Sequence, residues 1–155
     1  FVGDILVLWD GEASTFEKRI SVATEAHPTI TFTTEVGGNT INFLEVAVNI
    51  NNGKISTSLF RKETGRNNTL LASSFHPQSV TRANPEGQFI RARRISSTEE
   101  NYTKAANTLK ERFQIRGYNK VDIENSEKID KGSKRDDLLK YKPKEANKKK
   151  QIYHL

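Results

Sequence analysis

The chain has 155 residues, of which 34% are hydrophobic and 28% are charged, and its formal net charge is +6. This length suits one domain, or a small domain with a tail, and the low apolar content confines any core to part of the chain. The absence of cysteine excludes a disulfide framework, a thiolate zinc site and a cysteine nucleophile. The longest apolar run, residues 5–9, is far shorter than the roughly 20 residues that span a bilayer, so no membrane partner is expected.

Charge is divided unevenly along the chain. Residues 1–77 hold 6 Lys and Arg against 8 Asp and Glu, whereas residues 78–155 hold 19 against 11. Clustered Lys and Arg release counterions when they bind phosphates, so the second half predicts contact with a polyanion. For Lys148, Lys149 and Lys150 alone, the alternative is a solvated tail. From about Lys131 the pattern indicates a linker or disorder.

The first half of the sequence is rich in strand patterns. Residues 1–9 are strand-like from the first position, and residues 29–34 alternate Ile30 and Phe32 with threonine, which predicts a half-buried strand. Between them, residues 14–25 predict a short helix. Apolar residues recur over 40–50 and again over 55–60, on either side of Asn51-Asn52-Gly53, so these segments predict a hairpin closed by an Asn-Gly turn.

The second half predicts three helices. Asn84-Pro85 suits the start of the first, with Asn84 as the cap and Pro85 in the first turn, and this helix is expected to run to about Ile95. Ser97-Thr98 opens the second, and Gly117 ends it as the residue after the C-cap. Its buried face is predicted from apolar residues at three- and four-residue steps: Tyr102, Ala105, Ala106, Leu109 and Phe113. Val121, Ile123 and Ile129 mark a weaker third helix.

Four stretches carry a more specific signal when they are taken together. They are residues 1–9; residues 31–33 with 41–46; residues 58–67 with 73–77; and residues 87–95 with 112–118. In this order and at these spacings they resemble the C-terminal part of the reverse transcriptase of Penelope-like retroelements, the part described in animals as a helix-turn-helix domain. The resemblance covers about residues 1–118.

The resemblance implies an α+β fold in three parts. Residues 1–77 would be the end of a polymerase palm, with antiparallel strands and a hairpin like the one that grips the primer. Residues 78–131 would form a thumb-like or helix-turn-helix-like three-helix bundle, and residues 132–155 a disordered basic tail.

The resemblance also implies that this chain is catalytically incomplete. In the family, an aromatic-x-Asp-Asp motif supplies two carboxylates for two divalent cations, Mg²⁺ in the intact enzyme. The matching residues here are Phe1, Val2, Gly3 and Asp4, so glycine replaces the first aspartate. One carboxylate cannot hold two ions, and Asp4 is expected to be a vestige or an ordinary residue at a strand turn. No cofactor, small-molecule substrate or polymerase activity is expected.

Two basic clusters are candidates for nucleic-acid contact. Arg61, Lys62 and Arg66 follow the predicted hairpin and could meet backbone phosphates. The densest cluster is on the first helix of the second half, and its candidates are Gln88, Arg91, Arg93 and Arg94. Gln88, Arg91 and Arg94 are three residues apart and share one helical face. A solvated basic surface is the alternative for each cluster.

Three interpretations of function stay open at this point. The first is a reverse transcriptase fragment that binds an RNA–DNA hybrid or duplex DNA without catalysis. The second is an independent helix-turn-helix module, over residues 85 to about 131, that selects a duplex sequence. The third is a relic without function. The basic tail and the resemblance fit a nuclear location, although residues 148–150 are too short a run to decide it.

Overall fold

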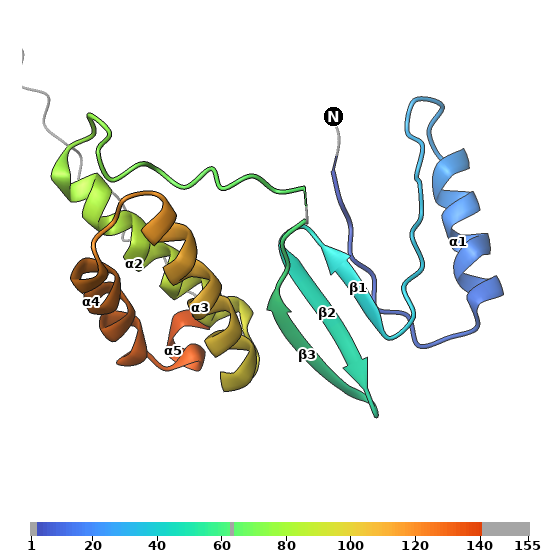
Figure 1. The fold of residues 1–155 in the computed structure, drawn as a ribbon. Coiled ribbons are helices and arrows are strands. Elements are labelled where there is room, and N and C mark those ends of the chain that lie inside the picture. Colours follow the sequence, from blue (N-terminus) through green and yellow to red (C-terminus); the bar gives the residue numbers. More distant parts are fainter. Residues whose placement is uncertain (1–2, 63, 141–155) are drawn as a thin grey trace, which may run out of the picture. The chain divides into compact units, whose positions relative to one another are not determined.

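The structure is a computed structural model that describes residues 3–62 and 64–140 (Figure 1). Strands of one antiparallel sheet are followed by helices, which confirms the predicted α+β class. The chain divides into two compact units, Phe1–Gly65 and Arg66–Leu155, and each is described by itself. The division of function among residues 1–77, 78–131 and 132–155 stays a prediction.

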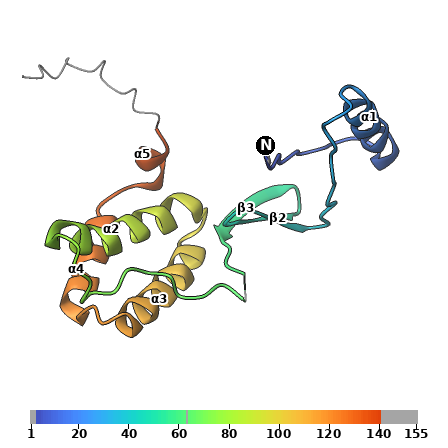
Figure 2. The same ribbon diagram turned by 90° about the horizontal axis from the view of Figure 1, so that it is seen from above.

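The sheet of the first unit contains β1 (Thr40–Phe43), β2 (Val46–Asn51) and β3 (Lys54–Leu59), in that order. Figure 2 shows the β2 and β3 pair from above. Asn51 pairs with Lys54, and the two residues between them have positive φ values, 50° at Asn52 and 72° at Gly53. A two-residue turn with two positive φ values is the I′ type that matches the twist of a hairpin. The predicted Asn-Gly hairpin is therefore confirmed.

The segment predicted as one strand over residues 40–50 is in fact two. Leu44 has a φ of 56°, and with Glu45 it forms a tight turn that pairs Phe43 with Val46. The turn lets residues 40–43 satisfy their backbone hydrogen bonds against β2, which an isolated strand could not do. The apolar alternation predicted extended backbone on both sides of this point but gave no signal for the reversal.

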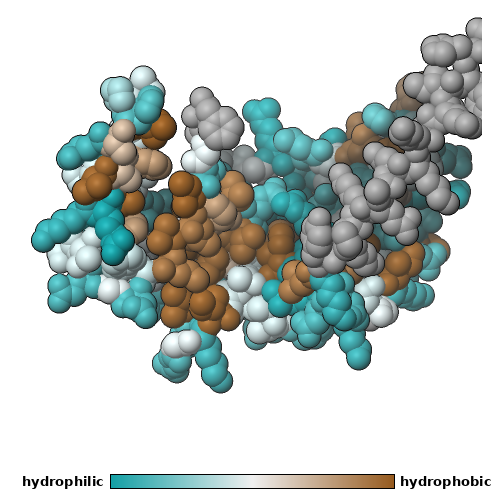
Figure 3. All heavy atoms as spheres, turned by 180° about the vertical axis from the view of Figure 1, so that it is seen from behind, coloured by the Kyte–Doolittle hydropathy of each residue, from teal (hydrophilic) through white to brown (hydrophobic). Residues whose placement is uncertain are grey.

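One face of the sheet is apolar and only partly covered. Strand partners point to the same side of a sheet, as do alternate residues along one strand. The residues on this face are Ile41, Phe43, Val46, Val48, Ile50, Ile55, Thr57 and Leu59. Among the described residues of the first unit, Val48 alone is buried, at 7% exposure, whereas Ile55 is 53% exposed. Figure 3 shows hydrophobic residues, in brown, gathered on the surface of this unit, which has almost no core.

The helix α1 (Ala13–Glu25) confirms the helix predicted near residues 14–25. It begins beside Trp9, whose indole N–H donates to the carbonyl of Glu12 at 3.1 Å and whose ring lies 5.6 Å from that of Phe16. No residue of α1 is buried. Contact with Trp9 therefore stabilises the first turn of α1, while the rest of the helix has little packing.

The strands predicted at residues 1–9 and 29–34 are wrong for the residues that the structure describes. Residues 3–10 and 30–37 have no regular secondary structure, and Ile30 and Phe32 are 49% and 37% exposed. A strand needs a neighbour to pair its backbone, and in the described chain the sheet comprises β1 to β3 alone. Alternating side chains predict a face, but they cannot supply the neighbour. Phe1 and Val2 lie outside the described residues.

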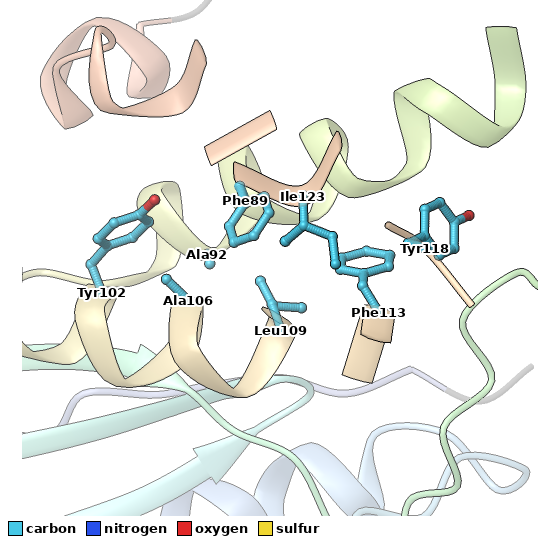
Figure 4. Packing of buried hydrophobic residues seen from close by; sticks show 8 residues of the cluster. All are labelled: Phe89, Ala92, Tyr102, Ala106, Leu109, Phe113, Tyr118 and Ile123. Carbon is cyan, nitrogen blue, oxygen red and sulfur yellow. The ribbon is translucent and has the colours of Figure 1, made fainter. Parts of the chain in front are cut away.

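The second unit contains the predicted three-helix bundle: α2 (Gln78–Ile95), α3 (Glu99–Ile115) and α4 (Lys120–Lys131). Its core takes residues from all three helices and from the turn before α4: Phe89, Ala92, Tyr102, Ala106, Leu109, Phe113, Tyr118 and Ile123. In Figure 4, Tyr102 lies at one end of this cluster and Tyr118 at the other, with Phe89, Ile123 and Phe113 between them. The predicted buried face of the second helix is confirmed, with Ala105 packed at its margin. The weaker third helix predicted from Val121, Ile123 and Ile129 is confirmed as α4, in which Ile123 is buried while Val121 and Ile129 are 65% and 55% exposed.

The predicted start of α2 at Asn84-Pro85 is wrong, because the helix begins at Gln78 and contains Pro85. A proline inside a helix loses one main-chain hydrogen bond and crowds the preceding turn. Here the ring of Pro85 is less than 2% exposed, so its burial offsets part of that cost. The amide of Asn84 donates to the Tyr118 hydroxyl at 3.2 Å instead of capping the helix.

The turn between α3 and α4 is closed by a Schellman motif. Gly117, at φ 84°, donates its N–H to the carbonyl of Gln114, and Tyr118 donates to that of Phe113, at 3.0 and 3.1 Å. The Phe113 and Tyr118 rings lie 5.1 Å apart. Asn119 then starts α4 by accepting the backbone N–H of Asp122 at 2.7 Å. Gly117 is therefore confirmed as the residue that ends the second predicted helix.

The tail predicted to be disordered from residue 132 contains a short helix, α5 (Arg135–Leu139). Nε of Arg135 donates to the carbonyl of Arg94 at 3.2 Å, which satisfies one of the free carbonyls at the end of α2. This contact corrects the prediction for residues 135–139. The run Lys148, Lys149 and Lys150 lies outside the described residues.

Candidate nucleic-acid interface

Positive charge in the bundle is concentrated on α2. That helix carries four arginines and one glutamate. In α3 the acidic and basic residues are equal in number, and α4 carries four carboxylates against three lysines. Phosphate contact depends on Lys and Arg, so α2 is the helix best suited to approach a nucleic-acid backbone.

Of the predicted contact residues on α2, Arg94 lies farthest from the core of the bundle. Phe89 and Ala92 are 0% exposed, whereas Arg94, about 200° around the helix from Ala92, is exposed. Gln88 and Arg91 are half-buried at the border of the same side, and Arg91 has a contact of its own within the chain. The geometry therefore presents Arg94 outward, with Gln88 and Arg91 beside it.

Arg93 is in a different environment, which its sequence neighbours do not indicate. Its side chain is 12% exposed and pairs with Glu99 at 2.5 Å. Its guanidinium carbon lies 3.4 Å from the centre of the Tyr102 ring. These contacts join the end of α2 to the start of α3, so the cation of Arg93 is used within the bundle.

The three residues of the first predicted basic cluster belong to different units. Arg61 and Lys62 are exposed after β3 in the first unit, and Arg61 has a contact within the chain. The side chain of Arg66 is exposed at the start of the second unit. Nucleic-acid contact by these three residues stays a prediction.

Asp4 lies in the described segment that has no regular structure, and both Asp4 and Gly3 are exposed. Within the described residues, no group of three or more His, Asp or Glu side chains is placed to hold a metal ion. The interpretation of Asp4 as a vestigial carboxylate stays a prediction.

Two arginines that were not among the predicted contact residues lie where α3 ends. Arg112 and Arg116 both donate to main-chain carbonyls of the segment 66–72, which we name the connecting segment. Nη2 of Arg112 is 3.0 Å from the carbonyl oxygen of Arg66, and Nε of Arg116 is 2.6 Å from that of Thr69. Spacing along α3 shows that the two arginines are neighbours, but it gives no signal that a distant segment packs against them.

Two pairs of helices could be the helix-turn-helix. Residues 96–98 join α2 to α3, and residues 116–119 join α3 to α4. The motif has a turn of about three or four residues that often contains glycine. The second pair, with Gly117 in its turn, fits this description better, whereas the first pair contains the cationic helix.

The comparisons with known proteins agree with the helical geometry. The family model of the animal helix-turn-helix domain matches residues 68–128, which include α2, α3 and most of α4. This match indicates a nucleic-acid-binding helix-turn-helix region. No curated protein and no solved structure matches the chain. None of the helices in the described part is long and apolar enough to cross a membrane.

Proposed function

We propose that the helical unit binds duplex nucleic acid through backbone phosphates, with little preference for sequence. The observation that carries this proposal is the charge of α2, four arginines against one glutamate, inside a region that matches the animal helix-turn-helix domain. Arg94, which is exposed, is the leading contact residue, and Gln88 and Arg91 border it.

The charge of α4 supports contact with phosphates over readout of base edges. In the pair α3 and α4, α4 takes the position of the recognition helix, which enters the major groove between two rows of phosphates. Its four carboxylates against three lysines make that approach unfavourable. The same charge does not oppose contact by α2.

The test is binding of the full chain to a DNA duplex and to an RNA–DNA hybrid over a series of salt concentrations. The logarithm of the affinity should fall linearly with the logarithm of salt concentration. Arg94→Ala should reduce the slope by about 0.9, the value for one phosphate contact on duplex DNA. The control is Lys128→Ala, which removes an exposed cation from α4. If the folded protein binds neither duplex, the proposal is contradicted. The remaining interpretation is then that the chain is a relic without function.

The alternative function is sequence-specific binding by an independent helix-turn-helix module. The glycine-containing turn of residues 116–119 favours this alternative. Selection from a random duplex pool distinguishes the two. Enrichment of one sequence, with relaxed preference at one base position in Arg91→Ala or Arg94→Ala, would support the module. A flat profile would support contact with phosphates.

The finer proposal is that the helical unit is the thumb of a reverse transcriptase fragment of the Penelope-like type. Its support is that the family match at residues 68–128 covers the part for which the resemblance implies a helix-turn-helix region. This proposal expects tighter binding to the RNA–DNA hybrid than to the DNA duplex. It also expects no incorporation of nucleotides with Mg²⁺ or Mn²⁺, because Gly3 replaces the first aspartate of the motif. Template-dependent extension would refute the catalytic part.

A further inference from the structure

We propose that Arg112 and Arg116, with Arg66, form a second phosphate-binding site where α3 ends; this inference rests on the proposed binding of duplex nucleic acid. Arg112 and Arg116 are four residues apart, so their side chains are neighbours on the surface of α3. Both reach the connecting segment, which brings the main chain of Arg66 to Arg112. The cations of Arg112 and Arg116 thus lie at the end of α3, and the main chain of Arg66, an exposed arginine, reaches the same place.

The main-chain contacts hold the two guanidinium groups in place. Nε of Arg116 donates to the carbonyl of Thr69 at 2.6 Å, and the backbone N–H of Ala72 donates to the carbonyl of Arg116 at 3.0 Å. Arg112 is held on two sides, because its carbonyl also accepts the side-chain amide of Asn67 at 2.9 Å. A guanidinium group has five N–H donors, and each carbonyl uses one of them. Nε of Arg112 is buried, and the Nη donors that these bonds leave over are preoriented at little further cost in side-chain entropy.

The charge of this cluster has no partner inside the described chain. Arg66, Arg112 and Arg116 form no ion pair with a described residue, in contrast to Arg93, which pairs with Glu99. Like charges four residues apart on a helix are destabilising by about 0.2–0.5 kcal/mol. Two arginines that only held the connecting segment would need donors but not two positive charges. An anion with several acceptor oxygens would satisfy both the charge and the remaining donors, and a backbone phosphate has this chemistry.

The test compares two double variants of the full chain, R112K/R116K and R112Q/R116Q, for binding to a DNA duplex over a salt series. Lysine keeps the charge but loses the guanidinium N–H groups that donate to the carbonyls, Nη2 of Arg112 and Nε of Arg116. Glutamine removes both the positive charge and the planar guanidinium group with its several N–H donors. If the arginines contact phosphates, the glutamine pair should lower the affinity at low salt by more than tenfold and reduce the salt slope by about 2, and the lysine pair should keep most of the slope. Equal loss of thermal stability in both pairs, with an unchanged slope, would overturn the inference and leave a structural clamp.

A measurement on the unmodified protein keeps the inference testable even if a variant fails to fold. The Nη–H resonances of Arg112 and Arg116 should shift in NMR spectra when the DNA duplex is added, and they should shift less when inorganic phosphate is added. Absence of a shift on saturation with the duplex would overturn the site.

The variant Arg94→Ala distinguishes failure of the second phosphate-binding site from failure of the proposed function. If the unmodified protein shows no salt-dependent binding, the proposed function fails. If it binds and Arg94→Ala weakens binding while R112Q/R116Q does not, the second site alone fails.

Discussion

The guanidinium carbon of Arg93 lies 3.4 Å from the centre of the Tyr102 ring, across the turn between α2 and α3. The ring is 1% exposed, so water screens this cation–π contact little. Glu99 binds the same guanidinium from the first turn of α3. Arg93 therefore differs from its neighbour Arg94, whose side chain is exposed.

Replacement of Arg93 should affect stability more than binding. We expect Arg93→Gln to lower the free energy of unfolding by about 1–2 kcal/mol, because a desolvated cation–π contact is lost together with an ion pair. Thermal denaturation measures this change. Glu99→Gln is the control and should cost less, since that carboxylate side chain is 71% exposed and its ion pair is screened. Unchanged melting with a salt slope reduced by about 1 would instead make Arg93 a phosphate ligand.

Two glycines of the helical unit should respond in opposite directions to alanine. Gly117 has a φ of 84°, where a side chain is strained by about 1–2 kcal/mol, so Gly117→Ala should be destabilising. Gly87 lies inside α2, and a Cβ added there would meet nothing within 4 Å. Gly87→Ala should stabilise the helix by about 0.5–1 kcal/mol. Urea denaturation gives the change in the free energy of unfolding for each variant. Changes of the same sign would contradict either the left-handed backbone at Gly117 or the helical backbone at Gly87.

The bundle should depend strongly on Phe113, which is 0% exposed. Phe113→Ala should cost about 3–5 kcal/mol, because it leaves a cavity beside Phe89 and Tyr118. Denaturation followed by helical circular dichroism should show a large shift of the midpoint. Ile129→Ala on α4 is the matched control. Its side chain is 55% exposed, and its loss should change the free energy by about 0.5 kcal/mol or less. A small effect at Phe113 would be inconsistent with this core.

The pair of Glu100 and Lys104 should contribute a pH dependence on the surface of α3. The pKa of Glu100 is lowered below its ordinary value of 4.5, first by the hydrogen bond from Lys104 and then by the charge of that ammonium. A carboxylate with a lowered pKa in the folded state stabilises the protein above the ordinary value. This contribution is lost as the pH falls through the folded value. NMR titration of the Glu100 carboxyl should therefore give a midpoint below 4.5.

The control for that titration separates the two lysines of α3. Lys104→Ala should return the midpoint of Glu100 to its ordinary value. Lys110→Ala should leave it unchanged, because Lys110 pairs with Glu127 of α4. A midpoint that moves equally in both variants would show a general charge effect instead of the pair.

Local patterns predicted the elements whose causes are local. The Asn-Gly turn, the start of α3 and Gly117 after it each depend on the conformation of a few adjacent residues. At the start of α3, the hydroxyl of Thr98 caps the helix by accepting the backbone N–H of Asn101 at 3.2 Å. The apolar spacing of α3 correctly predicted its buried face because every helical residue three or four positions on returns to the same side. The cationic side of α2 was visible in sequence for the same reason.

Tertiary contacts decided the rest. In the described residues, the strands predicted near residues 1–9 and 29–34 did not form, since alternation cannot provide a partner strand. The helix α2 begins seven residues before Pro85, and burial of that proline offsets part of its cost inside a helix. The different environments of Arg93 and Arg94, and the position of Arg112 and Arg116 against the connecting segment, depend on residues distant in space or sequence. The sequence by itself determined the α+β order and the location of positive charge, because helix periodicity and charge are properties of neighbouring residues. Which of those charges are engaged inside the protein was decided by packing between segments.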